Sequence, residues 1–397
     1  MQVKKSIFSY EKKKGDYTYY FNTLSRTLIK SKCDDQQKLA KYGFYVEDDF
    51  DEYKQLVFDY YRQCYNSKYF SITYLMTNAC NFRCTYCFES ELYKTNKEIN
   101  KINSSEFYNI CKYIVNKEHI EYLDVNFFGG EPLIKYNELI ATVKKINTLG
   151  CKCSYNIVTN GYLLNPYRIV EMKKCGISSM QITIDGCREN HDKYRVLKNG
   201  KPTYELIMKN TILAIKEGIE VIVNITYSND NFYSIDKFLR EFPLEYKDKV
   251  YIKFTRLLDL DKSDVEIMGK LYVSLKQNGF RTQDITHLEY GPCMNKLKNS
   301  LLVHADGKLS KCIFDVGEFS LGYAEFNADY NNIDKFLFPK KFNINKMAAD
   351  CLKCKFLPMC KGDCDRRRYS EKKTCRKDYF ESVANAIIEY YGDSENE

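Results

Sequence analysis

The stretch Cys80-Asn81-Phe82-Arg83-Cys84-Thr85-Tyr86-Cys87-Phe88-Glu89 carries the strongest structural signal in the chain, because its thiols fall at the spacing C-x3-C-x2-C. Three cysteines this close can hold three irons of a four-iron, four-sulfur cluster, and no fourth cysteine follows at a similar spacing. One iron is then left open for a ligand, as in a catalytic metal site. A closed zinc site fits poorly, because tetrahedral zinc needs a fourth ligand and no histidine lies near.

The three cysteines, with the aromatic Tyr86 before the last of them, resemble the signature of the radical S-adenosylmethionine (SAM) family. The resemblance implies that the open iron chelates the amino and carboxylate groups of SAM. It also implies that one electron from the cluster cleaves SAM to a 5′-deoxyadenosyl radical. A cluster of such low potential needs an electron donor, which we expect to be a flavodoxin or a ferredoxin.

Composition limits the class of protein. The chain has 397 residues, 44% hydrophobic and 29% charged, which is typical of a soluble protein with one large and one smaller domain. Without a long apolar run or a signal core after Met1, it is expected to be cytoplasmic and to have no membrane partner. Seventeen cysteines in a cytosolic chain indicate metal or cluster binding. The net charge of +8 is dispersed, so no nucleic acid partner is expected.

From residue 71 onward, apolar segments alternate with amphipathic ones. This pattern predicts six βα units, a parallel sheet, and either an open wound sheet or a partial barrel. The resemblance favours the barrel, a partial (β/α)6 TIM-like barrel with an α/β fold and a C-terminal cysteine-rich domain. The expected strands are 71–76, 122–128, 153–158, 180–184, 220–227 and 250–255; the expected helices include 104–117, 137–149, 166–175, 204–217 and 234–241.

Loops after these strands carry the predicted SAM site, since chemistry in such barrels lies at the carboxyl ends of the strands. The loop after the second strand contains Gly129, Gly130 and Glu131, and the resemblance implies that it binds the SAM amino group. Asn160 ends the third strand, while Asp185 and Arg195 follow the fourth; the resemblance implies contacts with the ribose and carboxylate of SAM. Other polar residues here have equally good structural explanations: His191 as a turn histidine, and Asn224 and Thr226 as polar packing on a strand.

The second group of cysteines lies near the C-terminus. Seven cysteines in about eighty residues, with a C-x2-C pair and a glycine at 307, indicate iron–sulfur clusters or zinc. Their spacing is similar to the SPASM extension of radical SAM enzymes, which implies two auxiliary four-iron clusters. The distal cluster would use Cys351, Cys354, Cys360 and Cys375, and the proximal one would use Cys293, Cys312 and Cys364. The proximal cluster is one ligand short: His287 or Glu289 fills the place, or the iron is open to a substrate thiolate.

The predicted domains are an N-terminal extension (1–70), the radical SAM barrel (71–285), the SPASM domain (286–380), and a C-terminal helix and tail (381–397). In the extension we predict a hairpin of 7–10 and 17–21 and an amphipathic helix over 48–65. The extension is interpreted either as a peptide-docking element, through addition of a strand, or as a packing extension of the barrel.

The resemblance implies an enzyme, a maturase of a ribosomally made precursor peptide. In the predicted mechanism the radical abstracts a hydrogen from a peptide carbon, and a cysteine sulfur most readily closes a thioether. Carbon–carbon crosslinking and epimerisation stay open. The alternative is an anaerobic sulfatase-maturing (formylglycine-generating) enzyme; those enzymes place Asp directly after the second SPASM cysteine, whereas Ile313 follows Cys312 here and Asp315 comes later.

Overall fold

The largest sheet has eight strands in the order β11-β10-β9-β8-β7-β6-β12-β13. The computed structural model describes residues 2–65, 68–89, 102–256, 267–281, 293–313, 333, 347–362 and 375–392. Strands β6 to β11 each pair in parallel with the next, so the predicted six-stranded parallel sheet is confirmed. The strands are β6 (Tyr69–Leu75), β7 (Tyr122–Phe128), β8 (Lys152–Thr159), β9 (Ser179–Thr183), β10 (Glu220–Tyr227), β11 (Val250–Arg256), β12 (Ser300–His304) and β13 (Leu309–Ser310).

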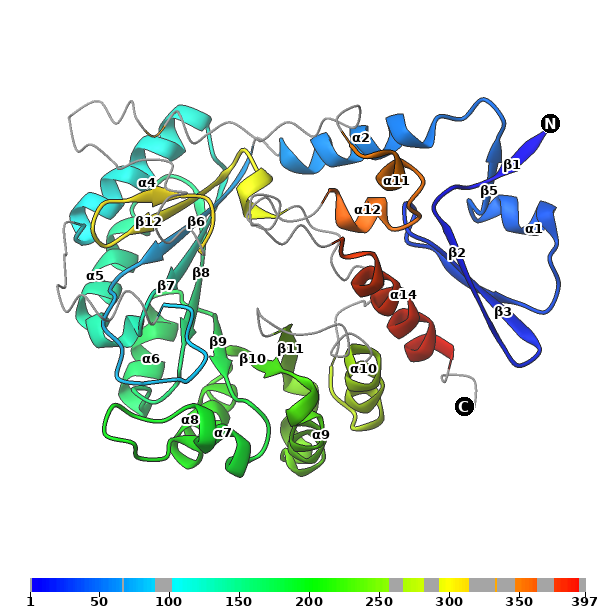
Figure 1. Ribbon diagram of the computed structural model, residues 1–397. Coiled ribbons are helices and arrows are strands. Elements are labelled where there is room, and N and C mark those ends of the chain that lie inside the picture. The colour runs from blue at the N-terminus through cyan, green and yellow to red at the C-terminus, as the bar shows by residue number, and fades with distance from the viewer. Residues whose placement is uncertain are drawn as a thin grey trace.

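Helices cover the outer face of this curved sheet (Figure 1). Alternate residues of the strands are buried, for example Leu123, Val125 and Phe127 of β7, because successive side chains point to opposite faces. Polar caps define where helices begin: Asn103 forms a capping box with Glu106. The helices are α4 (Ser104–Glu118), α5 (Tyr136–Ile146), α6 (Pro166–Lys174), α7 (Arg188–Tyr194), α8 (Tyr204–Lys216), α9 (Phe232–Glu241) and α10 (Ile267–Gln277), with 3-10 turns η1 (Pro132–Lys135), η2 (Asn229–Asn231), η3 (Leu244–Lys249) and η6 (Met294–Lys296).

The sheet extends into the region predicted as a separate cysteine-rich domain. Strand β12 pairs in parallel with β6, and β13 folds back antiparallel on β12. Buried Leu301 and Val303 join the main core, and Gly307 between the two strands has a φ of 88°. The predicted boundary at residue 286 therefore separates two segments that share one sheet.

The N-terminal region has its own small sheet of order β2-β3-β4, and β1 pairs with β5. The predicted hairpin is confirmed, since β2 and β3 pair antiparallel. The predicted helix over 48–65 begins later, because the Asp51 side chain caps the backbone N–H groups of Tyr53 and Lys54. The elements are β1 (Val3–Lys5), β2 (Ser9–Lys14), β3 (Tyr17–Asn22), β4 (Leu28–Ser31), α1 (Gln36–Lys41), β5 (Tyr45–Glu47) and α2 (Glu52–Cys64).

The N-terminal region packs against the C-terminal segments (Figure 1). Phe8, Leu56 and Tyr60 share a buried cluster with Leu357. The Tyr10 hydroxyl donates a hydrogen bond to Asn385 Oδ1 at 2.9 Å. The C-terminal helices are α11 (Ala349–Leu352), α12 (Leu357–Cys360) and α14 (Lys377–Gly392).

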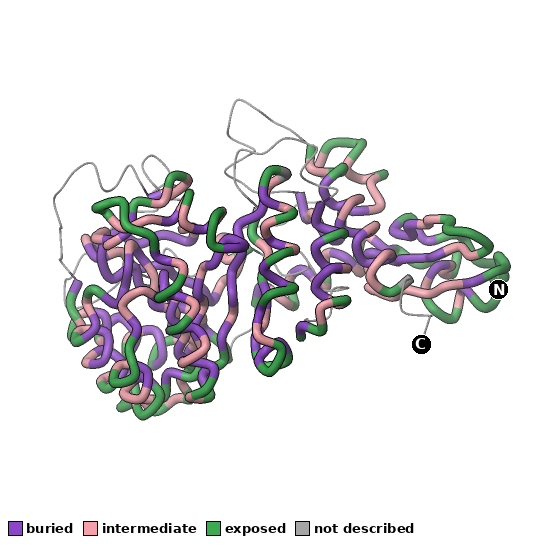
Figure 2. The backbone as a smooth tube through the Cα atoms, turned by 90° about the horizontal axis from the view of Figure 1, so that it is seen from below, coloured by how far each residue is buried: buried purple, intermediate pink, exposed green. Residues whose placement is uncertain are grey.

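Burial follows the same arrangement. Figure 2 shows that buried residues occupy the sheet and the inner faces of its helices. Buried residues continue along α14 toward the N-terminal sheet. At 16 residues α14 is long, but neither it nor another helix in the described ranges combines the length and apolar character needed to cross a membrane.

Candidate functional site

The loop that carries Cys80, Cys84 and Cys87 follows β6, at the carboxyl edge of the parallel sheet. Its backbone is fixed by hydrogen bonds from Arg83 N to Val196 O (2.9 Å) and from Thr85 N to Tyr194 O (3.1 Å). The buried Cys80 sulfur accepts hydrogen bonds from Phe82 N at 3.4 Å and from Asn160 Nδ2 at 4.0 Å. Hydrogen bonds to sulfur are one means by which proteins adjust iron–sulfur clusters.

The thiols of this loop lie within each other's electrostatic influence. Burial, with smaller contributions from Glu131 and the thiols of Cys84 and Cys87, raises the pKa of Cys80 to about 12. A cation is therefore needed to keep this sulfur deprotonated at neutral pH, and metal binding would release its proton. Within the described ranges no three thiol, carboxylate or imidazole groups are arranged closely enough to hold a metal ion.

Gly129 and Gly130 allow the loop after β7 to contact the backbone just before Cys80. Gly130 N donates to Thr77 O and Glu131 N donates to Ala79 O, both at 2.8 Å. A Cβ at Gly130 would lie 2.2 Å from Ala79 O, and one at Gly129 would lie 2.6 Å from Thr77 O. Gly129 also has a φ of 107°, which favours glycine. The two glycines thus place the predicted SAM-binding loop against the cysteine loop.

The Glu131 carboxylate is buried and joins the turn after β7 to the end of β8. It accepts hydrogen bonds from Thr159 Oγ1 (2.7 Å), Asn160 N (2.8 Å) and Leu133 N (3.0 Å). Burial raises its pKa, and these hydrogen bonds act in the opposite direction. Asn160 continues the connection, because its Nδ2 donates to Asn81 Oδ1 at 2.8 Å. Glu131 thereby ties the ends of β7 and β8 to the cysteine loop.

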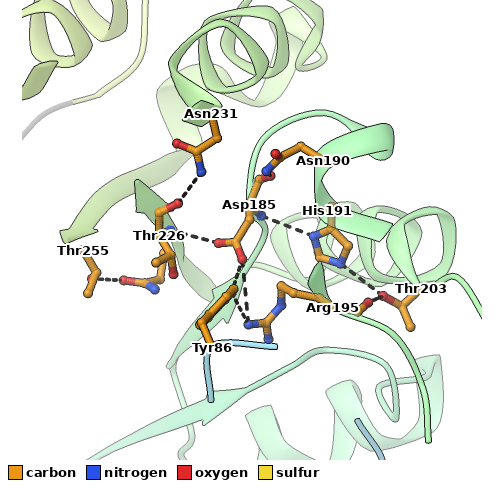
Figure 3. Close-up of polar contacts among 10 residues, drawn as sticks. Tyr86, Asp185, Asn190, His191, Arg195, Thr203, Thr226, Asn231 and Thr255 are labelled. Atoms are coloured by element: carbon orange, nitrogen blue, oxygen red, sulfur yellow. Dashed lines mark hydrogen bonds and ion pairs between the residues drawn. The ribbon is translucent and has the colours of Figure 1, made fainter. Parts of the chain in front are cut away.

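Figure 3 shows a polar group formed by Tyr86 of the cysteine loop with the buried side chains of Asp185 and Arg195. The Tyr86 hydroxyl donates to Asp185 and accepts from Arg195 Nη1 at 2.8 Å. Asp185 Oδ2 lies 4.0 Å from Arg195 Nη1, and its other oxygen accepts from Thr226 N at 2.9 Å. Burial raises the pKa of Asp185, while Arg195, Tyr86 and Thr226 oppose that change. In the described chain these two predicted SAM contacts bind each other.

His191 takes the structural role that was one of its two interpretations. Its ring is buried, with Nδ1 accepting from Asp185 N at 3.2 Å and Nε2 lying 3.1 Å from Thr203 Oγ1 (Figure 3). Burial, and to a lesser extent Arg195, lowers its pKa well below the usual value. Asn224 likewise has a strand partner, since its Oδ1 accepts from Thr255 Oγ1 at 2.6 Å.

Two buried nitrogens beside the cysteine loop, Asn81 Nδ2 and Arg195 Nε, have no hydrogen-bond partner among the described residues. Buried donors without partners are costly, so each of these groups fits a ligand that supplies an acceptor. The same region has three thiols on one loop and a glycine-rich loop packed against it. These features and the two unpaired donors fit an iron–sulfur cluster that carries an anionic ligand group.

The C-terminal cysteines lie beside the N-terminal region. Cys351 is in α11 and Cys360 ends α12, with Cys354 between them. Burial raises the pKa of the Cys354 thiol, and the Cys375 and Cys351 thiols add to that effect electrostatically. Cys293 directly precedes η6, and Cys312 lies two residues after β13. Cys364, His287, Glu289 and Asp315 lie outside the described residues.

Residues 74–241, which include the cysteine loop and the strands that carry the other predicted contacts, match the model of the Radical SAM superfamily. This part of the chain is a radical SAM domain. Its C-terminal cysteine-rich region fits the SPASM pattern.

Similar proteins agree with this fold. A cysteine-type anaerobic sulfatase-maturating enzyme of Clostridium novyi is 26% identical over 74% of this chain and 86% of its own. The structure of native anSMEcpe with bound AdoMet and Kp18Cys peptide has a TM-score of 0.65 at 20% identity, over 82% of this chain and 97% of that one. Streptococcus suis SuiB bound to precursor peptide SuiA has a TM-score of 0.58 at 13% identity, over 94% and 97%.

Several residues of the candidate site were not anticipated. The resemblance noted Tyr86 only as an aromatic, whereas its hydroxyl connects Asp185 with Arg195. Thr159 and Asn81 were not singled out, although one binds Glu131 and the other binds Asn160. Their common feature in the sequence is a polar side chain at a strand end or inside the cysteine loop, where a buried ligand site needs polar partners.

Proposed function

We propose that this chain is a radical SAM maturase that modifies a ribosomally made precursor peptide, with a thioether crosslink as the bond formed. The observation that carries the proposal is the buried loop system around Cys80, combined with a fold shared with SuiB over 94% of the chain. The anSMEcpe structure, which also holds a peptide, covers 82% of the chain at a higher TM-score of 0.65.

In this proposal Cys80, Cys84 and Cys87 hold the cluster, and Gly129, Gly130 and Glu131 border the SAM it binds. When bound, the cluster and SAM supply the 5′-deoxyadenosyl radical that removes a hydrogen atom from the substrate. The chain itself orients the ligand and excludes water from it. Glu131 holds the surrounding loops together, and the buried nitrogens of Asn81 and Arg195 offer hydrogen-bond donors to the ligand. Asn160 and Asp185 would act by holding these neighbours in place.

The cysteines of the SPASM region would hold two auxiliary clusters, the distal one through Cys351, Cys354, Cys360 and Cys375. The proximal set, Cys293, Cys312 and Cys364, is one ligand short unless His287 or Glu289 completes it. An incompletely ligated cluster suits a maturase that captures a substrate thiolate before the thioether closes. A flavodoxin or ferredoxin would deliver the electron, and the cytoplasm would be the location.

The second candidate is an anaerobic sulfatase-maturing enzyme, supported by the Clostridium novyi relative and the anSMEcpe structure. Against it stands Ile313, which follows Cys312 where those enzymes carry an Asp. A general base must reach the proton it removes, and isoleucine offers none.

Iron and zinc per chain, counted after anaerobic reconstitution, test the cofactor set. We expect about twelve irons, falling to about eight in a Cys80→Ala, Cys84→Ala, Cys87→Ala triple variant. The variant should also lose reductive SAM cleavage to 5′-deoxyadenosine. About four irons with one or two zincs would contradict the auxiliary clusters and remove the thiolate-binding step from the proposal.

Mass spectrometry separates the two functions. Incubation with a short Cys-rich peptide encoded beside the gene should give a product that lacks two hydrogens and one free thiol. A cysteine-containing sulfatase peptide should stay unmodified. An aldehyde on the sulfatase peptide, with loss of the cysteine sulfur, would replace the thioether proposal by the sulfatase-maturing one.

A further inference from the structure

Three thiols gather at the sheet edge opposite the candidate site. Cys151 immediately precedes β8 and Cys153 is its second residue, whereas the predicted cluster loop follows the carboxyl end of β6. Because β6, β7 and β8 run parallel, the amino end of β8 lies at the other edge of the sheet. The third thiol, Cys111 of α4, is buried, and burial together with the nearby Cys153 and Cys151 thiols raises its pKa. None of the three belongs to the predicted cluster ligands.

Cys151 and Cys153 are placed to react with each other. Their sulfur atoms lie 3.8 Å apart at the start of β8. Both are partly exposed, so small reagents reach them. A disulfide between them would shorten this separation to about 2 Å. Gly150 gives the preceding backbone room, since a Cβ there would meet nothing within 4 Å.

We propose that Cys151 and Cys153 form a thiol–disulfide redox site, oxidised by a low-molecular-weight disulfide and reduced by a dithiol. In the first step the Cys151 thiolate attacks one sulfur of the disulfide, which forms a mixed disulfide and releases one thiolate. The Cys153 thiol then gives up its proton and displaces the second thiol. Two S–H bonds of the chain are replaced by one S–S bond, and the oxidant is reduced to two thiols.

The surroundings assign the order of the steps. Burial, together with the neighbouring Cys151 thiol, raises the pKa of Cys153 to about 12. Cys153 is therefore protonated at neutral pH and also contacts Ile146 O at 4.0 Å. In this proposal Cys151 attacks first, and Cys153 reacts once a mixed disulfide is held beside it. Cys111 is too deeply buried to meet the oxidant.

The alternative is that these thiols only fill space, as buried cysteines often do. Cys175 offers a matched control for that alternative: it is also partly buried and packs on the same core, but no thiol contact involves it in the described chain. The redox site is independent of the proposed maturase function, and its test does not require a substrate peptide.

The test uses reconstituted holoenzyme under anaerobic conditions, equilibrated with mixtures of reduced and oxidised glutathione, then denatured, alkylated and cut with chymotrypsin. Cleavage after Leu149 and Tyr155 releases both cysteines in one peptide, 150–155. We expect this peptide to shift from doubly alkylated to two hydrogens lighter with no alkyl group, and to return fully with dithiothreitol. Oxidation of the pair should exceed glutathionylation of Cys175 by about tenfold at the same glutathione ratio.

Variants make the outcome decisive. Cys151→Ser should abolish the lighter peptide, and Cys175→Ser should leave it unchanged, with iron content unaltered in both. Doubly alkylated peptide at every glutathione ratio, a persistent glutathione adduct on Cys151, or pairing of Cys153 with Cys111 would each overturn the proposal.

Discussion

At the scale of single residues, the Tyr86 hydroxyl holds the buried Asp185 and Arg195 together, since their own charged atoms are 4.0 Å apart. We expect Tyr86→Phe to lower the free energy of unfolding by about 1–3 kcal/mol, because a buried donor and a buried acceptor each lose a partner. Denaturant unfolding of the reconstituted enzyme measures this change.

The control for this substitution is Tyr162→Phe, which removes a hydroxyl that makes no hydrogen bond within the described chain, although its ring packs on Phe82. Its effect should stay within about 0.5 kcal/mol. Equal losses in the two variants would show that the Tyr86 hydroxyl contributes nothing special to the site.

His191 makes stability depend on pH. Its pKa is lowered in the folded state, so near pH 6 the imidazole is protonated in the unfolded chain but stays neutral in the folded chain. Stability is therefore lost as the pH falls through the usual pKa of 6.5. When the pH is lowered from 7.5 to 5.5, His191 should reduce the free energy of unfolding by about 1.4 kcal/mol. We expect a His191→Asn variant to lose that much less than the wild type over the same interval. Identical pH slopes in urea unfolding would contradict the buried neutral state.

At the scale of elements, the contact between the loop after β7 and the loop after β6 depends on Gly130. A Cβ 2.2 Å from Ala79 O cannot be relieved by rotating a side chain, because the atom it meets is backbone. Gly130→Ala should therefore displace the cysteine loop by about 1 Å and slow SAM cleavage by about 100-fold.

Gly150→Ala is the matched control, because a Cβ there meets nothing within 4 Å and the residue also lies in a turn before a strand. It should retain the wild-type rate of 5′-deoxyadenosine formation. A Gly130→Ala enzyme with an unchanged rate would mean that the close approach of the two loops has no part in the chemistry.

At the scale of the whole molecule, α14 joins the N-terminal sheet to the barrel. It packs on α10, where a Cβ at Gly269 would lie 3.3 Å from the Ala386 Cα, and Lys12 of β2 pairs with its Glu389 at 3.2 Å. We expect Gly269→Val to push α14 away, at a cost of about 1–3 kcal/mol. Hydrogen exchange should then rise in α14 and in β2, while β7 stays protected.

Lys270→Ala, on the exposed side of the same helix, serves as the control and should leave exchange unchanged. Faster exchange confined to α14 in the Gly269→Val protein would show that the N-terminal sheet does not depend on this helix.

The sequence predicted the parallel sheet well because its signals are local. Each strand from β6 to β11 is an apolar run bounded by turns, and β7 and β10 match their predicted bounds residue by residue. The addition of β12 to β6 was missed, because pairing between segments some 230 residues apart leaves no periodic mark in either one. The packing of the N-terminal region on α12 was missed for the same reason.

The site divides in a similar way. The cysteine spacing and the paired glycines can be recognised from the sequence alone. Cluster ligation and close backbone approach both require particular residue types at fixed separations. The partners of Asp185 were not foreseeable, since a carboxylate at a strand end has the same sequence signature whether it faces a ligand or a buried arginine.

By itself, the sequence determined the radical SAM signature, the order of strands and helices, and the cysteines available to hold clusters, since short-range spacing and periodicity control all three. Only the tertiary structure decided which polar groups are satisfied within the chain and which buried donors, Asn81 Nδ2 and Arg195 Nε, still lack a partner among the described residues. Burial decides this, because the cost of an unpaired polar group arises only when folding removes water from it.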